Sequence, residues 1–283
     1  MKSSKLSIYG NVILDRVLGI SEFPKEGVAS TVAAYRSSPG ASANVARAYY
    51  NITQQKPKLY SCIGLDLEGK ECEQGMSRYA NPLFYVSPHL DTSSAVILDC
   101  KPNVTRTGLV KWGACAEMTI FSEDGSEWKH FCYLDKLPGL DKKKLSNLKG
   151  IKSADLTSFD YDTACKNRII ECLSEIDYLI TSKEEAGYLV NNNDPKDIVV
   201  SLGKLCKQFA ILHDPTGSYV SDGNVFFRVA ALHNTLEKIS VLGAGDIFAA
   251  AFISAYSSDL TVVDILLKSH NKTYEILKEG LNK

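Results

Sequence analysis

The sequence has no long hydrophobic run and no excess of basic residues. Among its 283 residues, 45% are hydrophobic and 23% are charged, and the formal net charge is −1 at pH 7. No stretch reaches the roughly 18 apolar residues that a membrane-spanning helix requires. A nearly neutral chain offers no basic surface for nucleic acid, and residues 1–14 lack the apolar segment of a signal peptide. We therefore expect a cytoplasmic protein with no membrane or nucleic-acid partner. Its length suits one large α/β domain or two small ones.

Paired cysteines and the best-known phosphate motifs are also missing. The eight cysteines are scattered through apolar segments without a CxxC pair, which favours reduced core thiols over zinc sites or disulfides. No GxxxxGK[ST] sequence is present, so a Walker-type phosphate loop is excluded. The HRD and DFG sequences that are typical of protein kinases are also absent. Phosphate chemistry in this chain would therefore depend on another kind of loop.

A glycine-rich turn near the C-terminus is such a loop. A strand is predicted over residues 236–241, Gly243 and Gly245 then interrupt the pattern, and apolar residues recur at helical spacing up to Ala255. The first amides of a helix have no partner within the helix and attract anions, and glycine lets the backbone approach an anion closely. Asp246 stands where the turn becomes the helix. It is either the helix N-cap or a general base beside a phosphate.

Two polar residues near the N-terminus are candidates for binding a ligand. Asp15 lies five residues beyond Gly10, which ends the predicted strand 5–9. A carboxylate just past the end of a strand lies where ligands bind in open α/β sheets, and it can accept hydrogen bonds from two hydroxyls. A surface turn is the alternative. Asn44 is in the first turn of a helix predicted over residues 40–51, where it can donate to and accept from a hydroxylated ligand.

Five segments, taken in this order, resemble motifs of the pfkB, or ribokinase-like, family of carbohydrate and nucleoside kinases: residues 10–15, 23–27, 39–46, 63–69 and 243–246. The resemblance covers nearly the whole chain. It implies a three-layer α/β/α sandwich with a mostly parallel sheet, in a single domain over residues 1–283. It also implies a small β lid with strands within residues 16–38 and 92–135, including a hairpin that turns at residues 122–126. Asp66, within the GxDxxG sequence, is expected to have an architectural role.

The resemblance further implies an ATP-dependent kinase that transfers the γ-phosphoryl group to a hydroxyl of a sugar or nucleoside. Ribose, fructose-like ketoses and nucleosides such as pseudouridine are the substrate classes. Asp246 would be the general base, beside a turn that binds the developing charge. The catalytic residues implied are Gly243, Ala244, Gly245 and Asp246. The substrate-binding residues implied are Asp15, Gly40 and Asn44.

Three more positions match residues that bind the nucleotide and its Mg²⁺ ion in this family. Gly217 and Asn271 would bind ATP, and Glu185 would help to hold the metal. Glu185 has a second explanation, because Ser182 and the acids after it are typical of a helix N-terminus. His213 and Asp214 are not a catalytic pair, because the side chains of adjacent residues at a strand end point apart. We therefore interpret His213 as a loop residue.

Several positions depart from the family pattern. Pro39 replaces one of two glycines that flex when the lid closes, and proline fixes φ. Residues 240–242 replace an aspartate and two threonines that help to bind a monovalent cation in many relatives. Residues 138–182 leave no room for a further strand–helix unit of about 30 residues. Pro39, the missing strand–helix unit, Ser182 in place of an asparagine and the altered loop 213–217 favour a second hypothesis, a binding or regulatory protein with weak or no catalysis. The retained residues 243–246, Asp15 and Asn44 favour the enzyme. A homodimer formed through the lid is also expected from the resemblance.

Overall fold

The computed structural model describes residues 5–100, 105–119, 121–158, 161–231, 243–257 and 259–279. Within these residues the chain forms a sheet of nine strands and a sheet of four. The strand predicted over residues 236–241, and the substituted residues 240–242, lie outside the described residues.

The larger sheet is parallel over most of its width. Its strands are β1 (Leu6–Tyr9), β4 (Lys58–Gly64), β5 (Asn81–Ser87), β8 (Trp128–Phe131), β9 (Ile151–Ala154), β10 (Tyr178–Ser182), β11 (Phe209–Asp214), β12 (Gly217–Ser221) and β13 (Phe226–Ala230). Their order is β13-β12-β11-β10-β9-β8-β1-β4-β5. All strands from β11 to β5 pair in parallel, and β12 and β13 add an antiparallel edge. A parallel sheet is buried on both faces, which explains why β1 and β8 have no exposed position.

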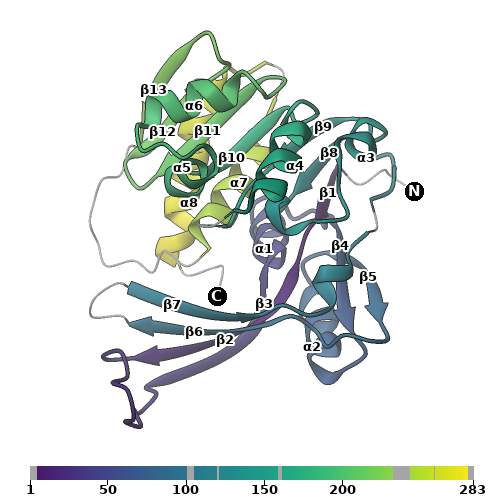
Figure 1. Cartoon of the computed structure of the whole chain (residues 1–283), viewed down its shortest axis with the longest axis vertical. Helices are drawn as coiled ribbons and strands as arrows, with labels where there is room; N and C mark the ends of the chain where they lie inside the picture. The colour runs from purple at the N-terminus through teal and green to yellow at the C-terminus, as the bar shows by residue number, and fades with distance from the viewer. Residues whose placement is uncertain are drawn as a thin grey trace.

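Helices cover both faces of this sheet (Figure 1). They are α1 (Ser42–Thr53), α2 (Leu67–Met76), α3 (Lys142–Ser146), α4 (Thr163–Leu173), α5 (Lys183–Val190), α6 (Pro195–Gly203), α7 (Ala244–Ala255) and α8 (Val262–Glu279), with short 3-10 helices η2 (Ala114–Glu117) and η3 (Leu134–Lys136). One hydrophobic core contains side chains of α1, α2, α7 and α8, and a second contains side chains of α3 to α6. This arrangement confirms the predicted three-layer α/β/α sandwich.

Aspartate side chains begin several of these helices. Asp162 accepts a hydrogen bond from the Cys165 amide at 2.7 Å and so caps α4. Asp66 caps α2 by accepting from the Gly69 amide at 2.7 Å, and it also accepts from the Thr92 amide at 2.7 Å. Asp66 therefore joins α2 to a segment 26 residues further along the chain, which agrees with an architectural role.

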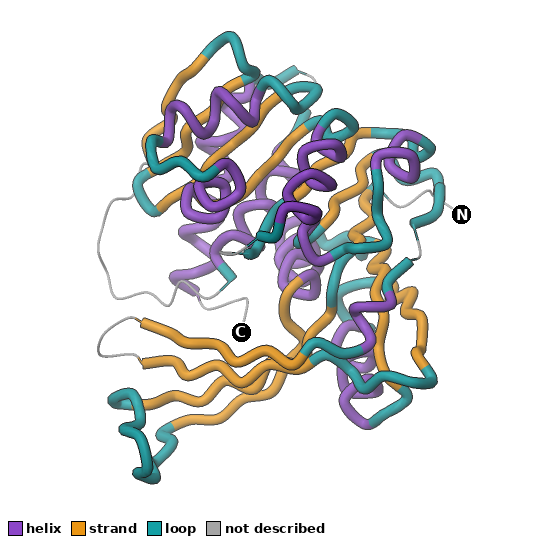
Figure 2. Tube along the Cα trace, in the orientation of Figure 1, coloured by secondary structure: helices purple, strands orange, loops and turns teal. Residues whose placement is uncertain are grey.

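The smaller sheet extends away from the helices (Figure 2). It consists of β2 (Val12–Ile20), β3 (Ala34–Ala41), β6 (Ser94–Cys100) and β7 (Thr105–Lys111), in the order β3-β2-β6-β7. These strands come from the two regions that the sequence assigns to a lid, although β2 begins before residue 16 and β3 ends after residue 38. The role of this sheet as a lid stays a prediction.

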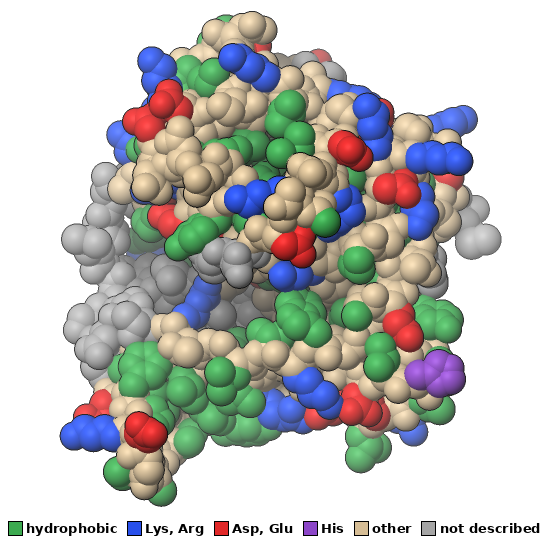
Figure 3. All heavy atoms as spheres, viewed as in Figure 1, with side chains coloured by type: hydrophobic (Ala, Val, Ile, Leu, Met, Phe, Trp, Pro, Cys, Tyr) green, Lys and Arg blue, Asp and Glu red, His purple; other side chains and the backbone are tan. Residues whose placement is uncertain are grey.

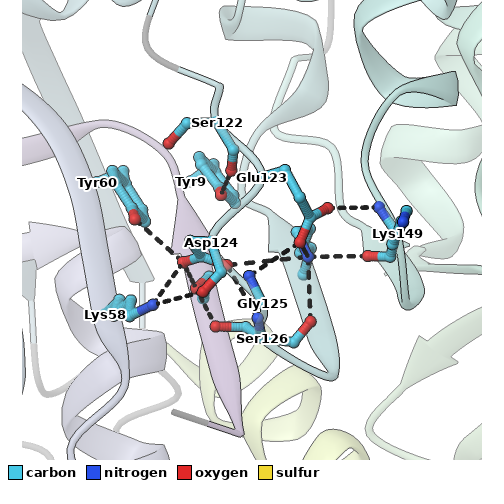
Figure 4. Close-up of polar contacts among 11 residues, drawn as sticks. Tyr9, Lys58, Tyr60, Ser122, Glu123, Asp124, Gly125, Ser126 and Lys149 are labelled. Atoms are coloured by element: carbon cyan, nitrogen blue, oxygen red, sulfur yellow. Dashed lines mark hydrogen bonds and ion pairs between the residues drawn. The ribbon is translucent and has the colours of Figure 1, made fainter. Parts of the chain in front are cut away.

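The hairpin that the sequence places in the lid at residues 122–126 was wrongly assigned. The strand after this turn, β8, pairs in parallel with β1 and β9 of the larger sheet. The turn itself is fixed to the start of that sheet, because Asp124 accepts hydrogen bonds from Ser7 Oγ at 2.5 Å and from Tyr60 Oη at 3.0 Å (Figure 4). The error arose because a short, fully buried parallel strand carries no alternation that distinguishes it from one arm of a hairpin.

The larger sheet is continuous where the sequence is short. β9 pairs directly with β10, and α4 forms the connection between them. The described residues of the interval 138–182 therefore hold no further strand–helix unit, and the sheet closes without one. At the C-terminus, α8 runs without a break, since no glycine or proline lies within it. None of the described helices is both long and apolar enough to cross a bilayer.

Candidate active site

The carboxyl ends of the parallel strands bring together residues from both ends of the chain. Asn44 in α1 donates a hydrogen bond from Nδ2 to Asp246 Oδ2 in α7 at 2.9 Å, across 202 positions of sequence. Asp15, in β2 just beyond β1, is close enough to Asp246 to raise its pKa. The structure thus places Asp15, Asn44 and Asp246 at one location, where open α/β sheets bind ligands.

Asp246 is not the N-cap of α7. Gly243 occupies the N-cap position with a φ of 75°, and none of the described side chains caps this helix. Asp246 lies in the first turn and is 8% exposed, with its carboxylate bonded to Asn44. The interpretation of Asp246 as the helix cap is therefore wrong, and its carboxylate is left available for a ligand.

The surroundings of Asp246 hold its proton unusually tightly. Burial raises the pKa of Asp246 to about 8, and the carboxylates of Asp155 and Asp15 add to the increase. The hydrogen bond from Asn44 and the positive charge of Arg106 act in the opposite direction. A carboxyl group that titrates near neutral pH is suited to accept a proton during catalysis.

The first turn of α7 has the form of an anion site. The amides of Ala244, Gly245 and Asp246 precede the first bond within the helix, from the Ile247 amide to the Gly243 carbonyl at 2.9 Å. Such amides are unpaired inside the helix and lie at its positive end. They can therefore bind a phosphoryl group next to the Asp246 carboxylate.

Gly40 determines where the carboxylate of Asp15 can lie. A Cβ atom at Gly40 would be 1.8 Å from Asp15 Oδ2, a distance that no side chain can occupy. Burial raises the pKa of Asp15 to about 7, against the opposing charges of nearby arginines. The next residue, Ala41, has a φ of 55°, which is unfavourable for alanine and common at functional sites. The link from β3 to α1 is thus held in a strained form beside Asp15.

Arg47, which the sequence analysis did not identify, orients Asn44. Its side chain is 5% exposed, and it donates to Asn44 Oδ1 at 3.1 Å and to the Pro39 carbonyl at 2.9 Å. Because Arg47 occupies the oxygen of the Asn44 amide, the nitrogen is directed to Asp246. The pair therefore fixes which end of Asn44 faces the carboxylate.

Glu185 forms the helix cap that its sequence context suggested. Its Oε2 accepts from Thr181 Oγ1 at 2.8 Å and from the Ser182 amide at 3.1 Å, while Ser182 Oγ accepts from the Glu185 amide at 3.1 Å. Burial still raises the pKa of Glu185 to about 7, and Asp155 contributes to the increase. Asp155 thus acts on both Glu185 and Asp246. A Mg²⁺ ion, with its preference for oxygen ligands, would favour the ionised forms of these buried carboxyl groups.

Asp155 is itself held by its neighbours in the buried interior. Its carboxylate accepts a hydrogen bond from the Tyr133 amide and lies 3.3 Å from His130 Nε2. His130, Cys132 and Asp155 offer donor atoms that all lie within 4.8 Å of one another. Burial raises the pKa of the Cys132 thiol, so this sulfur is not prepared to bind a metal. The trio is better explained as the support that positions Asp155.

The two residues predicted to bind ATP lie in β12 and α8. Gly217 has a φ of 142°, and a Cβ there would be 2.1 Å from the Val229 carbonyl, so the pairing of β12 with β13 requires glycine. Asn271 Oδ1 is buried and has no hydrogen-bond partner in the described part of the chain. An unpaired buried oxygen can accept from an amino group such as that of adenine.

His213, interpreted above as a loop residue, is in fact the fifth residue of β11. It packs against the start of α7, since a Cβ at Gly245 would be 3.3 Å from His213 Cε1. Its ring centroid is 5.0 Å from that of Phe248, and burial lowers the pKa of His213 to about 4. The imidazole is therefore neutral at pH 7 and forms part of the wall beside the turn.

Among the site residues that were not predicted, Asp155 could most easily have been recognised from the sequence. It directly follows β9, so the rule that drew attention to Asp15, a carboxylate past a strand end, applies to it as well. No sequence pattern near Arg36 or Arg106 marks either arginine as a site residue.

Known structures of the same fold include nucleoside and sugar kinases. The chain superposes on adenosine kinase from Sinorhizobium meliloti with a TM-score of 0.80 and 16% identity, covering 98% of this chain and 94% of that one. The nucleoside kinase from Methanocaldococcus jannaschii superposes with a TM-score of 0.75 and 19% identity, covering 98% of this chain and 92% of that one. Ribokinase from Thermotoga maritima superposes with a TM-score of 0.75 and 16% identity, covering 96% of this chain and 99% of that one. No curated protein matches the sequence.

The family model places the chain more firmly than these distant structures do. The model of the pfkB family of carbohydrate kinases matches residues 3–271, which is nearly the whole sequence. The fold is the ribokinase-like α/β fold of the structures above. On this evidence, the chain belongs to the pfkB carbohydrate kinase family.

Proposed function

We propose that this protein transfers the γ-phosphoryl group of ATP to a hydroxyl of a sugar or nucleoside. The observation that carries the proposal is the environment of Asp246. This carboxylate has a pKa raised to about 8, lies in the first turn of a helix whose amides favour anions, and is bonded to Asn44. A base beside an anion site is what an alcohol requires in order to attack a phosphoryl group.

Asp15, Gly40 and Asn44 are the proposed substrate-binding residues. Asp15 accepts hydrogen bonds from substrate hydroxyls, and Gly40 leaves room for its carboxylate. The attacking oxygen forms a bond to the γ-phosphorus as the bond to the β-phosphate oxygen breaks, ADP leaves, and the hydroxyl proton passes to Asp246. The amides of Gly243, Ala244 and Gly245 bind the charge on the transferred group.

Gly217, Asn271 and Glu185 are the proposed contacts for ATP and its metal. The unpaired Asn271 Oδ1 supports a contact with the base of the nucleotide. The buried carboxylates of Glu185 and Asp155 fit a divalent cation, which when bound would neutralise phosphate charge. Glu185 uses Oε2 in the helix cap, so its other oxygen is the one available to the metal or to a metal-bound water.

The range of candidate phosphoryl acceptors is taken from the family and from the similar structures. Those structures are an adenosine kinase, a nucleoside kinase and a ribokinase, so sugars and nucleosides are both candidates. Incubation with ATP and Mg²⁺ and a panel of pentoses, ketohexoses and nucleosides, followed by mass spectrometry, tests the activity. We expect a phosphorylated product and ADP with at least one acceptor, and loss of both when EDTA removes the metal. ADP formation that does not depend on any acceptor would contradict the proposal.

A binding or regulatory protein is the second candidate, favoured by the use of Glu185 in a helix cap. Thermal unfolding with ATP and Mg²⁺ separates the two. A ligand at 100 times its Kd adds about 2.7 kcal/mol of stability. The enzyme requires stabilisation by millimolar ATP, and an unchanged melting temperature would support the second candidate.

We also propose one domain over residues 1–283, a cytoplasmic location and a homodimer that pairs the smaller sheets. Hydrophobic side chains gather over this sheet in Figure 3, and Tyr35 and Leu109 on its face opposite Asp15 are 63% and 65% exposed. Sedimentation of the purified protein checks the dimer, since the Tyr35→Ser, Leu109→Ser double variant should sediment as a monomer.

A further inference from the structure

Two arginines share a face of the smaller sheet with Asp15. In β2 and β3, Val17 pairs with Arg36, and Val17 is two residues from Asp15, so Arg36 and Asp15 point to the same side. In β6, Asp99 is four residues beyond the partner of Asp15, and it pairs with Arg106 of β7. Arg36 and Arg106 therefore approach the substrate site from two different strands of this face.

Arg36 differs from the neighbouring Arg47 in having an unmet donor. Arg47 is bonded to Asn44 and to the Pro39 carbonyl and lies 5.6 Å from the ring centroid of Tyr79. Arg36 Nε is buried and has no hydrogen-bond partner among the described residues. A buried donor without a partner is unfavourable, and at a ligand site it indicates a missing acceptor.

More guanidinium groups than ion-paired carboxylates surround Asp15 among the described residues. Arg47, Arg36 and Arg106 each lower the pKa of Asp15, so all three guanidinium groups are near this carboxylate. Asp99 is directly opposite Arg106, yet within the described ranges no ion pair of 4.0 Å or less joins them. A neutral sugar offers hydroxyls to Asp15 but no partner for two guanidinium groups.

We propose that the acceptor substrate carries an anionic group, a phosphate monoester or a carboxylate, that Arg36 and Arg106 bind while Asp15 holds its hydroxyls. This inference rests on the proposed kinase function and narrows its substrate class. A guanidinium group presents two parallel N–H donors that match the oxygens of either anion, and such charged hydrogen bonds are about twice as strong as neutral ones. The anion lies on the face of the smaller sheet beside Asp15, where Arg36 and Arg106 both exert their charge.

Matched acceptor pairs test the substrate class. Fructose and fructose 6-phosphate each keep a free primary hydroxyl, and glucose and gluconate form the corresponding pair for a carboxylate. With ATP and Mg²⁺, we expect kcat/KM to be at least about 10-fold higher for one anionic member than for its neutral partner. The pair that shows the preference identifies phosphate or carboxylate. Equal or lower values for both anionic members would overturn the proposal.

Variants then test the two arginines. Arg36→Gln and Arg106→Gln should each raise KM for the preferred anionic acceptor by about 10- to 100-fold and change the neutral partner less than about 2-fold. Arg16→Gln is the matched control, because Arg16 is in the same sheet but pairs with Glu68 on the opposite face. Equal losses for the anionic and the neutral acceptor would assign the arginines to the transferred group and overturn the proposal.

Binding without ATP separates this inference from the proposed function. Thermal unfolding is followed with fructose 6-phosphate or gluconate alone, for the wild type and Arg36→Gln. If no acceptor is phosphorylated, the kinase proposal fails, but stabilisation by one anion that is lost in Arg36→Gln still supports the anion site. If neither anion stabilises the wild type and no anionic acceptor is preferred, the inference is wrong.

Discussion

Asp124 and Asp246 are both buried carboxylates, at opposite ends of the same parallel strands, and their surroundings are opposite in kind. Asp124 accepts hydrogen bonds from Ser7 and Tyr60 and lies 3.2 Å from Lys58 Nζ (Figure 4). Although burial acts to raise its pKa, these partners lower the pKa of Asp124 to about 2. Among the described residues, Asp246 accepts one side-chain hydrogen bond, from Asn44, and burial together with nearby carboxylates raises its pKa to about 8.

The difference separates a stabilising carboxylate from one kept for chemistry. The amino ends of β1, β4 and β8 use Asp124 to compensate buried positive charge, including Lys129, whose side chain is 0% exposed. Among the described residues, the carboxyl ends leave Asp246 without an ion pair to a basic side chain. A site that must bind Mg²⁺ and phosphate, and accept a proton, cannot be fully compensated before its ligands arrive.

Exchanging Asp246 for Asn should have the largest effect on rate. The amide keeps the shape of the side chain but cannot accept the substrate proton, so turnover should fall by about 10²- to 10⁴-fold. The assay is acceptor-dependent ADP formation, with circular dichroism to confirm the fold. Asp124→Asn is the matched control and should keep its turnover below its own melting temperature. An Asp246→Asn enzyme with more than a tenth of wild-type turnover would remove the base from the mechanism.

Asp124→Asn should instead reduce stability. Loss of this charge removes the carboxylate beside Lys58 and one of the two that compensate the buried Lys129, the other being Glu123. The free energy of unfolding should therefore fall by about 2 kcal/mol. Because the pKa of Asp124 is lower in the folded protein, its contribution is complete above about pH 4 and is lost as the pH falls towards 2. Urea unfolding of the wild type and the variant at pH 7 and pH 3 measures both effects. A loss below 1 kcal/mol at pH 7 would show that the network has little net value.

Gly40→Ala should have a smaller effect that is confined to substrate use. The added methyl group displaces the Asp15 carboxylate, and misplacement of a binding group by about 1 Å can lower kcat/KM by up to about 100-fold. Gly108→Ala in β7 is the control, because a Cβ there meets nothing within 4 Å. We expect kcat/KM to fall at least about 10-fold in the first variant and to stay unchanged in the second. Equal behaviour of the two variants would show that Gly40 does not position Asp15.

The sequence predicted those features that depend on local pattern. The glycine turn before α7, the carboxylate after β1 and the alternation of strands and helices are each legible within a few residues, and the architecture they implied is confirmed. Glu185 shows the limit of such patterns, since one motif fitted both a metal ligand and a helix cap. The structure shows the cap, and the metal role stays a prediction.

Features that depend on long-range pairing were not predictable from one sequence. β8 lies between β1 and β9 because of its burial on both faces, which no periodicity within its four residues reveals. Arg36 and Arg106 reach Asp15 through the register of four strands. Arg47 was not recognised because an arginine in an amphipathic helix is usually exposed. Contacts between distant segments decide each of these cases.

Thermal unfolding of the wild type and Asp246→Asn from pH 5 to pH 9, without Mg²⁺ or ATP, tests the central claim most directly. The pKa of Asp246 is about 8 in the folded protein, above its ordinary value, so its stabilising effect is complete at low pH and is lost as the pH rises through 8. Carboxyl groups that do not interact with Asp246 titrate alike in both proteins and cancel in the comparison, whereas Asp15 and Asp155 do interact with it. The account predicts that the variant becomes more stable than the wild type as the pH increases to 9. A variant that is equally stable or less stable at pH 9 would show that Asp246 is a compensated structural group.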